Sequence, residues 1–291
     1  MANADASPAT TADPSTSRAA ALGVAAASPD AAHRRARAEW LALYASDAEV
    51  RDPVGTPVCR KDHSTRPGTG KNDLELFFDT FIAGMQAMQV DVLLDVVVGD
   101  VVARDVVLRP TMAFGVESAI PTRLLYELTR EDGRLVVQRL GAYWDASRAT
   151  QRTLRAGLRG KGSMLISSAR MARYLGRAWM QRYVKGTKEG ARRPGREATL
   201  AFGDALRASD LEAARALCAT GATFRLREQP LSLDELAALD LGLTLRDPIA
   251  SGDVVTARCS ALHGGRAVDG IAFATFERES RKLIDLRLLW E

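Results

Sequence analysis

The sequence has few of the residues that build disulfide or metal sites, and no long apolar run. Its three cysteines, Cys59, Cys218 and Cys259, are odd in number and far apart, so neither a disulfide framework nor a zinc ribbon is indicated. Its three histidines form no HExxH spacing. No apolar run approaches the roughly 20 residues that span a bilayer. We therefore expect no metal, no cofactor and no transmembrane helix.

The N-terminus lacks the pattern of a signal peptide. The first 16 residues are mostly Ala, Ser, Thr, Pro and Asp, a composition that favours disorder. Acidic residues occur early, at Asp5 and Asp13, and the apolar stretch at 19–27 is short and alanine-rich. We expect a disordered tail at 1–16, a first-domain helix over 19–27, and a cytoplasmic protein.

Basic charge is concentrated in one segment. The net charge is +4, but residues 146–196 hold fourteen Lys or Arg and one acid, Glu189, a net +13. The rest of the chain therefore carries −9. A basic segment between two acidic blocks indicates a connector between two domains.

Three short patterns occur twice in the same order, which indicates an internal repeat. GDVVAR at 99–104 returns as GDVVTAR at 252–258, and EDGRL at 131–135 returns as ESRKL at 279–283. Each of the latter leads to a closing Trp, Trp144 or Trp290. Upstream, 41–50 matches 214–224 with one residue inserted. The second copy is shorter, with 28 residues between Phe224 and Gly252 against 49 between Val50 and Gly99.

Each copy is predicted to contain helices followed by strands. The spacing of Leu74, Phe77, Phe78, Phe81, Ile82 and Met85 gives one apolar helical face, and Trp40, Leu43 and Tyr44 suggest the same for the preceding helix. Strands are predicted over 90–98, 101–108, 124–129 and 135–143, with hairpins at Gly99-Asp100 and Asp132-Gly133. The pattern predicts an α+β fold in which helices pack on a curved, mostly antiparallel sheet.

The segment around Asp52 is the most informative. Side chains alternate along a strand, so Asp52 would share the core face of Val50, and Pro53 favours extended geometry at Asp52. A carboxylate on an apolar face should have a raised pKa and is a candidate general base. The Asp-Pro-x-Gly sequence is also an ordinary turn signal.

The run from Asp47 to Pro57 (DAEVRDPVGTP) resembles the signature of the ketosteroid isomerases in the NTF2-like (nuclear transport factor 2), or SnoaL-like, superfamily. The Phe77-Phe78 helix and the closing Tyr143-Trp144-Asp145 fit that family as well. The resemblance covers residues 18–146, and residues 197–291 resemble the superfamily in outline. It implies tandem cone-shaped domains with an apolar pocket, and it places proton transfer beside a carbonyl on Asp52.

The sequence departs from that family at the oxyanion hole. The family tyrosine would fall within 19–27 and the second aspartate near Leu124, but neither is present. Tyr44, Tyr126 or Trp144 could donate instead, although core packing would also explain these side chains. In the second copy Leu226 replaces the carboxylate, and Phe202 offers an aromatic surface without a hydroxyl. Substrate-binding residues are predicted at Trp40, Tyr44, Phe78, Phe81, Met112, Tyr126 and Trp144.

The connector can be drawn as one amphipathic helix over 163–184. Leu165, Ser168, Ala172, Leu175, Trp179 and Tyr183 fall on one side, and Arg170, Arg173 and Arg177 on another. Such a helix could dock on its own domains or lie on an anionic membrane surface. No nucleic-acid signature is present.

The sequence therefore predicts four segments: a tail (1–16), a first NTF2-like domain (17–146), a basic helical linker (147–196) and a degenerate second NTF2-like domain (197–291). The leading hypothesis is a ketosteroid isomerase-like protein that binds a small apolar carbonyl ligand, with isomerase or cyclase and lyase chemistry at Asp52. The alternative is a non-catalytic tandem module for a hydrophobic ligand or a protein partner. The two domains are expected to pair within the chain or to form a homodimer.

Overall fold

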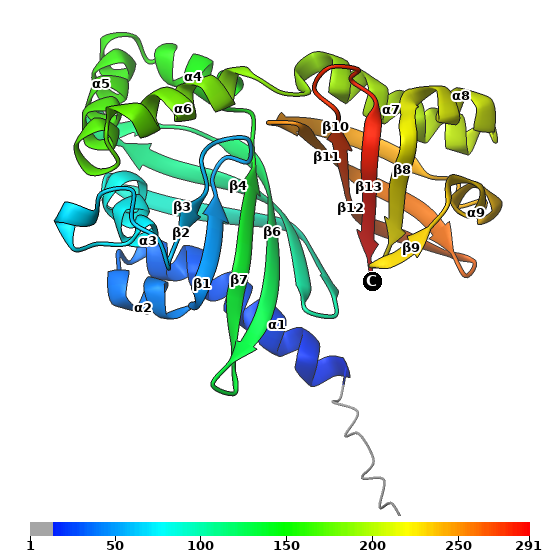
Figure 1. Ribbon diagram of the computed structural model, residues 1–291, viewed down its shortest axis with the longest axis horizontal. Coiled ribbons are helices and arrows are strands. Elements are labelled where there is room, and N and C mark those ends of the chain that lie inside the picture. The colour runs from blue at the N-terminus through cyan, green and yellow to red at the C-terminus, as the bar shows by residue number, and fades with distance from the viewer. Residues whose placement is uncertain (1–13) are drawn as a thin grey trace, which may run out of the picture.

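The computed structural model describes residues 14–291, with side chains from Arg18 onward. It consists of two α+β units, each with its own sheet, joined by a helical connector (Figure 1). The expected α+β class is confirmed. Residues 1–13 of the expected tail lie outside the described residues, and the first helix already begins at Pro14.

The first unit contains a seven-stranded sheet with strand order β2-β1-β7-β6-β4-β3, and β5 pairs with β4. Its helical elements are α1 (Pro14–His33), α2 (Arg37–Ala42), η1 (Pro67–Thr69), α3 (Asp73–Phe77), the π-helical η2 (Phe78–Ile82) and η3 (Ala113–Gly115). Its strands are β1 (Tyr44–Arg51), β2 (Cys59–Arg60), β3 (Ala87–Val98), β4 (Val101–Met112), β5 (Val116–Glu117), β6 (Ile120–Glu131) and β7 (Arg134–Tyr143). All four strands predicted from the Val-rich runs are present.

The second unit contains a six-stranded sheet with strand order β10-β11-β12-β13-β8-β9. Its helices are α7 (Arg192–Arg207), α8 (Leu211–Leu217) and α9 (Leu233–Ala238). Its strands are β8 (Cys218–Leu226), β9 (Gln229–Leu231), β10 (Thr244–Ser251), β11 (Val254–His263), β12 (Arg266–Phe276) and β13 (Leu283–Trp290). Taken from the other edge, this order repeats that of the first unit, including one parallel pair, β1 with β7 and β8 with β13.

The registers of the two parallel pairs match residue by residue. Val50 lies opposite Leu140 in the first unit, and Phe224 lies opposite Leu286 in the second. Asp52 and Leu226 are equivalent, because each lies two residues after Val50 or Phe224. Trp144 and Trp290 are equivalent as well, because each lies four residues after the facing residue, Leu140 or Leu286.

The core of the first unit lies between α1 and the sheet. Buried residues of α1 recur at helical spacing, at Ala21, Ala25, Ser28 and Ala32. Small side chains let α1 approach the strands closely. The predicted helix through Tyr44 is wrong at its end, because Tyr44 joins β1 and pairs with Val137 in β7.

The two sheets pack against each other through their other faces. Along β4 and β6, Val102 and Tyr126 enter the core of the first unit, whereas Ala103 and Leu125 join Ile271, Phe273 and Leu289 in a cluster shared by both units. The Tyr143 and Phe273 rings meet edge to face at 5.2 Å. The Arg287 guanidinium lies 3.2 Å from the Glu127 carboxylate across this contact. Because side chains alternate along a strand, one apolar face of each sheet packs inside its own unit and the opposite face packs against the other unit.

The connector consists of α4 (Ala146–Leu154), α5 (Gly157–Tyr174) and α6 (Arg177–Lys188). The prediction of one helix over 163–184 is wrong, because the chain turns at Gly176, which adopts a left-handed φ of 90°. Leu175 and Trp179 are 1% and 2% exposed within the first-unit core. Arg170 donates to the Thr80 carbonyl at 3.3 Å. The connector therefore docks on the first unit, and its Trp179 is not available as a membrane anchor. No helix within residues 14–291 is long and apolar enough to cross a bilayer.

Candidate functional site

Asp52 lies in a turn directly after β1. The strand ends at Arg51, one residue earlier than the alternation argument needed, and the backbone N–H of Thr56 bonds to the Pro53 carbonyl at 3.1 Å. Gly55 adopts a left-handed φ of 98° in this turn, a conformation that glycine accommodates without steric cost. The turn predicted from Asp-Pro-x-Gly is therefore present, and the strand position predicted for Asp52 is wrong, although its half-buried side chain still reaches Trp144.

The Asp52 carboxylate is held by an indole. Trp144 Nε1 donates to Asp52 Oδ1 at 2.6 Å, which joins two residues 92 positions apart in the chain. Burial raises the pKa of Asp52 to about 6, although the bond from Trp144 opposes the rise. Trp144 had been predicted as a substrate-binding residue, and here its N–H orients the carboxylate.

Three tyrosines lie close enough to Asp52 for its charge to affect them. Burial is the main cause of the raised pKa of Tyr44, Tyr126 and Tyr183, and the Asp52 charge contributes in each case. For Tyr126 the pKa rises to about 12, with the Arg104 guanidinium opposing the shift. All three hydroxyls therefore stay protonated at neutral pH and can donate hydrogen bonds.

Ser28 is a site residue that the sequence analysis missed. Its hydroxyl lies 3.0 Å from the Tyr44 hydroxyl, and both side chains are buried. A signal was present, because among residues 18–33 of α1 Ser28 is the one hydroxyl on a buried face otherwise lined by alanines. It lies on the helix where the family resemblance would place a tyrosine, one residue beyond the expected 19–27.

Aromatic rings line the rest of this interior. Trp40 lies 4.5 Å from Tyr44 and 5.6 Å from Phe78 between ring centroids. From the connector, Tyr183 stacks on Phe81 at 5.8 Å. The structure thus brings together six of the seven predicted substrate-binding residues: Trp40, Tyr44, Phe78, Phe81, Tyr126 and Trp144.

Met112 does not belong to this group. It lies at the end of β4, opposite Val116 of β5, and is partly exposed. Its position follows from the length of β4, which runs four residues beyond the predicted end at Leu108. The prediction that Met112 lines the same interior is therefore wrong, and Met112 lies at the end of the sheet.

The second unit has no counterpart of the acid. Leu226 is buried at the equivalent position, and Trp290 is fully buried with an Nε1 that has no hydrogen-bond partner in the described part of the chain. Phe202 and Phe224 stack at 6.0 Å in its core. Residues 14–291 also contain no group of three or more His, Cys, Asp or Glu side chains placed to hold a metal ion.

Comparisons with known proteins found similar solved structures. No family model matches the chain, and no curated protein matches it. A Mycobacterium sp. Δ5-3-ketosteroid isomerase is 22% identical, with a TM-score of 0.35, over 44% of this chain and 95% of that protein. A Mycobacterium tuberculosis protein, solved with estradiol-17beta-hemisuccinate, is 23% identical, with a TM-score of 0.36, over 44% of this chain and 95% of its own. An NTF2-like protein of unknown function from Cytophaga hutchinsonii is 14% identical, with a TM-score of 0.31, over 33% of this chain and 89% of its own.

Proposed function

We propose that the first unit binds a small apolar ligand with a carbonyl group and that Asp52 acts on it as a general acid and base. The observation that carries this proposal is the Asp52 carboxylate, which accepts a hydrogen bond from Trp144 Nε1 at 2.6 Å and whose pKa is raised to about 6 by desolvation. At pH 7 roughly nine in ten such groups are ionised, yet each is a stronger base than an ordinary carboxylate.

The chemistry that fits these groups is proton transfer beside the carbonyl. Ionised Asp52 removes a proton from the carbon next to the carbonyl, and the electron pair of that C–H bond moves toward the carbonyl oxygen. The protonated Tyr44 and Tyr126 hydroxyls are the available donors to the resulting enolate oxygen. Protonated Asp52 then returns the proton to another carbon of the same conjugated system, so the net reaction is an isomerisation.

A Δ5-3-ketosteroid is the first substrate to test, because the segment from Asp47 to Pro57 resembles the ketosteroid isomerases. Asp52→Asn keeps an acceptor for Trp144 Nε1 but removes the base, and we expect turnover to fall by about 10²–10⁴-fold. The matched control is Asp132→Asn, an exposed residue in the β6–β7 turn, where turnover should not change. Equal turnover of the wild type and Asp52→Asn would exclude Asp52 as the base.

The alternative is a tandem binding module without catalysis. It is favoured by the connector, because Trp179 and Tyr183 of α6 already pack on Phe81, and by the engagement of Trp144 with Asp52. Steroid binding measured by tryptophan fluorescence, without turnover in the wild type, would favour this module over the enzyme. Absence of both binding and turnover would contradict both proposals for steroids.

We also infer that the two units arose by duplication of one unit. Three sequence patterns recur in order, and the six-strand order and the parallel register coincide. In this interpretation the second unit lost its acid at Leu226 and now serves as the packing partner of the first.

A further inference from the structure

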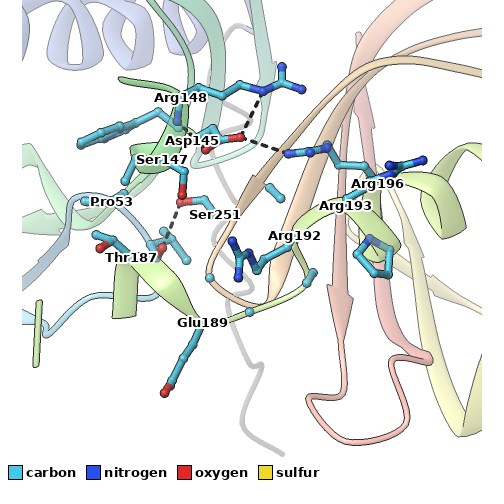
Figure 2. A pocket seen from close by; sticks show the side chains of 18 of the residues that line it. Pro53, Asp145, Ser147, Arg148, Thr187, Glu189, Arg192, Arg193, Arg196 and Ser251 are labelled. Carbon is cyan, nitrogen blue, oxygen red and sulfur yellow. Dashed lines mark hydrogen bonds and ion pairs between the residues drawn. The ribbon is translucent and has the colours of Figure 1, made fainter. Parts of the chain in front are cut away.

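A cavity lies between the two units, next to the turn that carries Asp52. It has a volume of about 490 Å³, and its walls come from the first turns of α4 and α7, the Pro53-Val54 turn, and the end of β10 (Figure 2). We name it the interunit cleft. Because both units and the connector contribute to it, the cleft forms only in the complete chain.

The interunit cleft is strongly basic. Five arginines line it (Arg148, Arg192, Arg193, Arg196 and Arg281) against two acids, Asp145 and Glu189. Asp145 already binds Arg148 at 3.3 Å and Arg196 at 3.0 Å. Glu189 lies 3.3 Å from Arg278 and 3.8 Å from Lys185. Both acids are therefore engaged, and a net positive charge is left.

Two of the arginines are free to bind a ligand. Within residues 18–291, neither Arg192 nor Arg281 forms an ion pair, and both are exposed. Arg193 also lines the cleft, but its guanidinium pairs with Glu197 at 2.7 Å. A guanidinium presents a planar fork of donors that matches phosphate and carboxylate oxygens.

The start of α7 adds to this field. No side chain caps that helix, whereas Asp145 caps α4 through the backbone N–H of Arg148 at 3.0 Å. The positive end of α7, which is 16 residues long, therefore meets the cleft without an acceptor from a capping side chain, although Pro194 in its first turn has no N–H to donate.

The floor of the cleft is preformed. Ser251 Oγ donates to the Val54 carbonyl at 2.9 Å, and the backbone N–H of Ala191 donates to the Gly252 carbonyl at 2.8 Å. Gly55 and Gly252 pack backbone to backbone, so that a Cβ on Gly55 would lie 2.5 Å from Gly252 Cα. These contacts fix the two units relative to each other, so the cleft between them is already formed.

We propose that the interunit cleft binds a small anion with two or more charges, carrying phosphate or carboxylate groups. Arg192 and Arg281 supply the principal contacts, and the start of α7 supplies further attraction. The cleft borders the Asp52 site, because Pro53 and Trp144 are among its lining residues, but Asp52 itself is not one of them.

The test is isothermal titration calorimetry of the full chain at low ionic strength with pyrophosphate and with citrate, which separate the phosphate and carboxylate sources. We expect at least one to bind, and Arg192→Ala/Arg281→Ala to weaken that binding by about 10-fold or more. The control is Arg134→Ala/Arg266→Ala, which removes the same charge from exposed hairpin positions and should weaken binding less than about twofold.

Three outcomes would overturn the proposal: no heat from either anion, equal weakening by both double variants, or full competition by chloride at matched ionic strength. Both double variants should retain the unfolding temperature of the wild type, because the four arginines are exposed. Asp52→Asn should bind the anion as the wild type does, so failure here is distinguishable from failure of the function proposed for Asp52.

Discussion

The two units share a strand order but differ at one pair of equivalent positions. In the first unit, Trp144 Nε1 donates to Asp52 at 2.6 Å. In the second, Leu226 stands in place of the acid, and Trp290 Nε1 is buried without a partner in residues 14–291. The position of the indole is therefore shared by the two units, and the residue at the position of Asp52 or Leu226 determines whether the indole N–H has a carboxylate acceptor.

The units also differ in what surrounds this pair. The first unit places the Tyr44 and Ser28 hydroxyls 3.0 Å apart in its core and receives α6 as a cover. The second has the stacked Phe202 and Phe224 rings. The first interior therefore contains a pair of hydroxyls beside its aromatic rings, whereas the second has stacked phenyl rings and the unpaired Trp290 N–H.

The largest effect is expected when the second unit is given an acid. Leu226→Asp removes a buried aliphatic side chain and introduces a carboxylate, so we expect the free energy of unfolding to fall by about 5 kcal/mol at pH 8. Below the raised pKa of the new carboxyl group, part of that loss should be recovered. Denaturant unfolding at pH 8 and pH 5 measures this effect.

The control for that experiment is Leu226→Asn, which has a similar shape and no charge. Its loss should be smaller and equal at the two pH values. If Leu226→Asp lost the same stability at both pH values, the equivalence of Leu226 with a buried acid position would be wrong.

A smaller effect of opposite sign is expected when the acid is removed from the first unit. The folded pKa of Asp52 is about 6, above the unfolded value of 3.8, so the folded state favours the protonated form. The contribution of Asp52 to stability is therefore most favourable below pH 4 and falls as pH rises through 6, by at most about 3 kcal/mol. Asp52→Asn should therefore raise the free energy of unfolding at pH 7.5 by up to that amount and change it little at pH 4.

Urea unfolding of Asp52→Asn and Asp132→Asn at both pH values measures this difference. The exposed Asp132 should shift stability by less than about 0.5 kcal/mol at either pH. An Asp52→Asn variant that is destabilised at pH 7.5 would show that the carboxylate is not desolvated.

Much of the fold follows from local patterns, and less of the site does. The strands were predictable because Val-rich runs end at Gly99 and Gly133, which adopt left-handed φ values of 57° and 75° in the hairpins. The raised pKa of Asp52 was predicted from alternation with Val50, but β1 ends at Arg51 and the following turn is what places the carboxylate. The bond of Asp52 with Trp144 was not predictable, because it depends on the parallel register of β1 and β7, which no local pattern specifies.

Other features depend on packing between distant segments. The break between α5 and α6 at Gly176 was missed because the apolar spacing continues through it, and the arrangement was fixed only by docking of Trp179 on the first unit. The interunit cleft combines residues from Pro53 to Arg281. Charge counting located the basic segment but could not show which arginines face one another.

The smallest and most discriminating effect concerns the two indoles. Trp144→Phe removes the donor to Asp52, so the pKa of Asp52 should rise further and stability should fall by about 1–3 kcal/mol. Trp290→Phe removes an N–H that has no partner within residues 14–291, so its cost is limited to the lost volume, and burial of an unpaired donor is relieved. We expect Trp290→Phe to lower the free energy of unfolding less than Trp144→Phe does, even though Trp290 is the more deeply buried side chain.

Chemical denaturation of both variants measures the loss of stability, and NMR titration of the Asp52 carboxyl group measures its pKa. An equal loss of stability in the two variants would mean that the Trp144 bond adds nothing beyond packing.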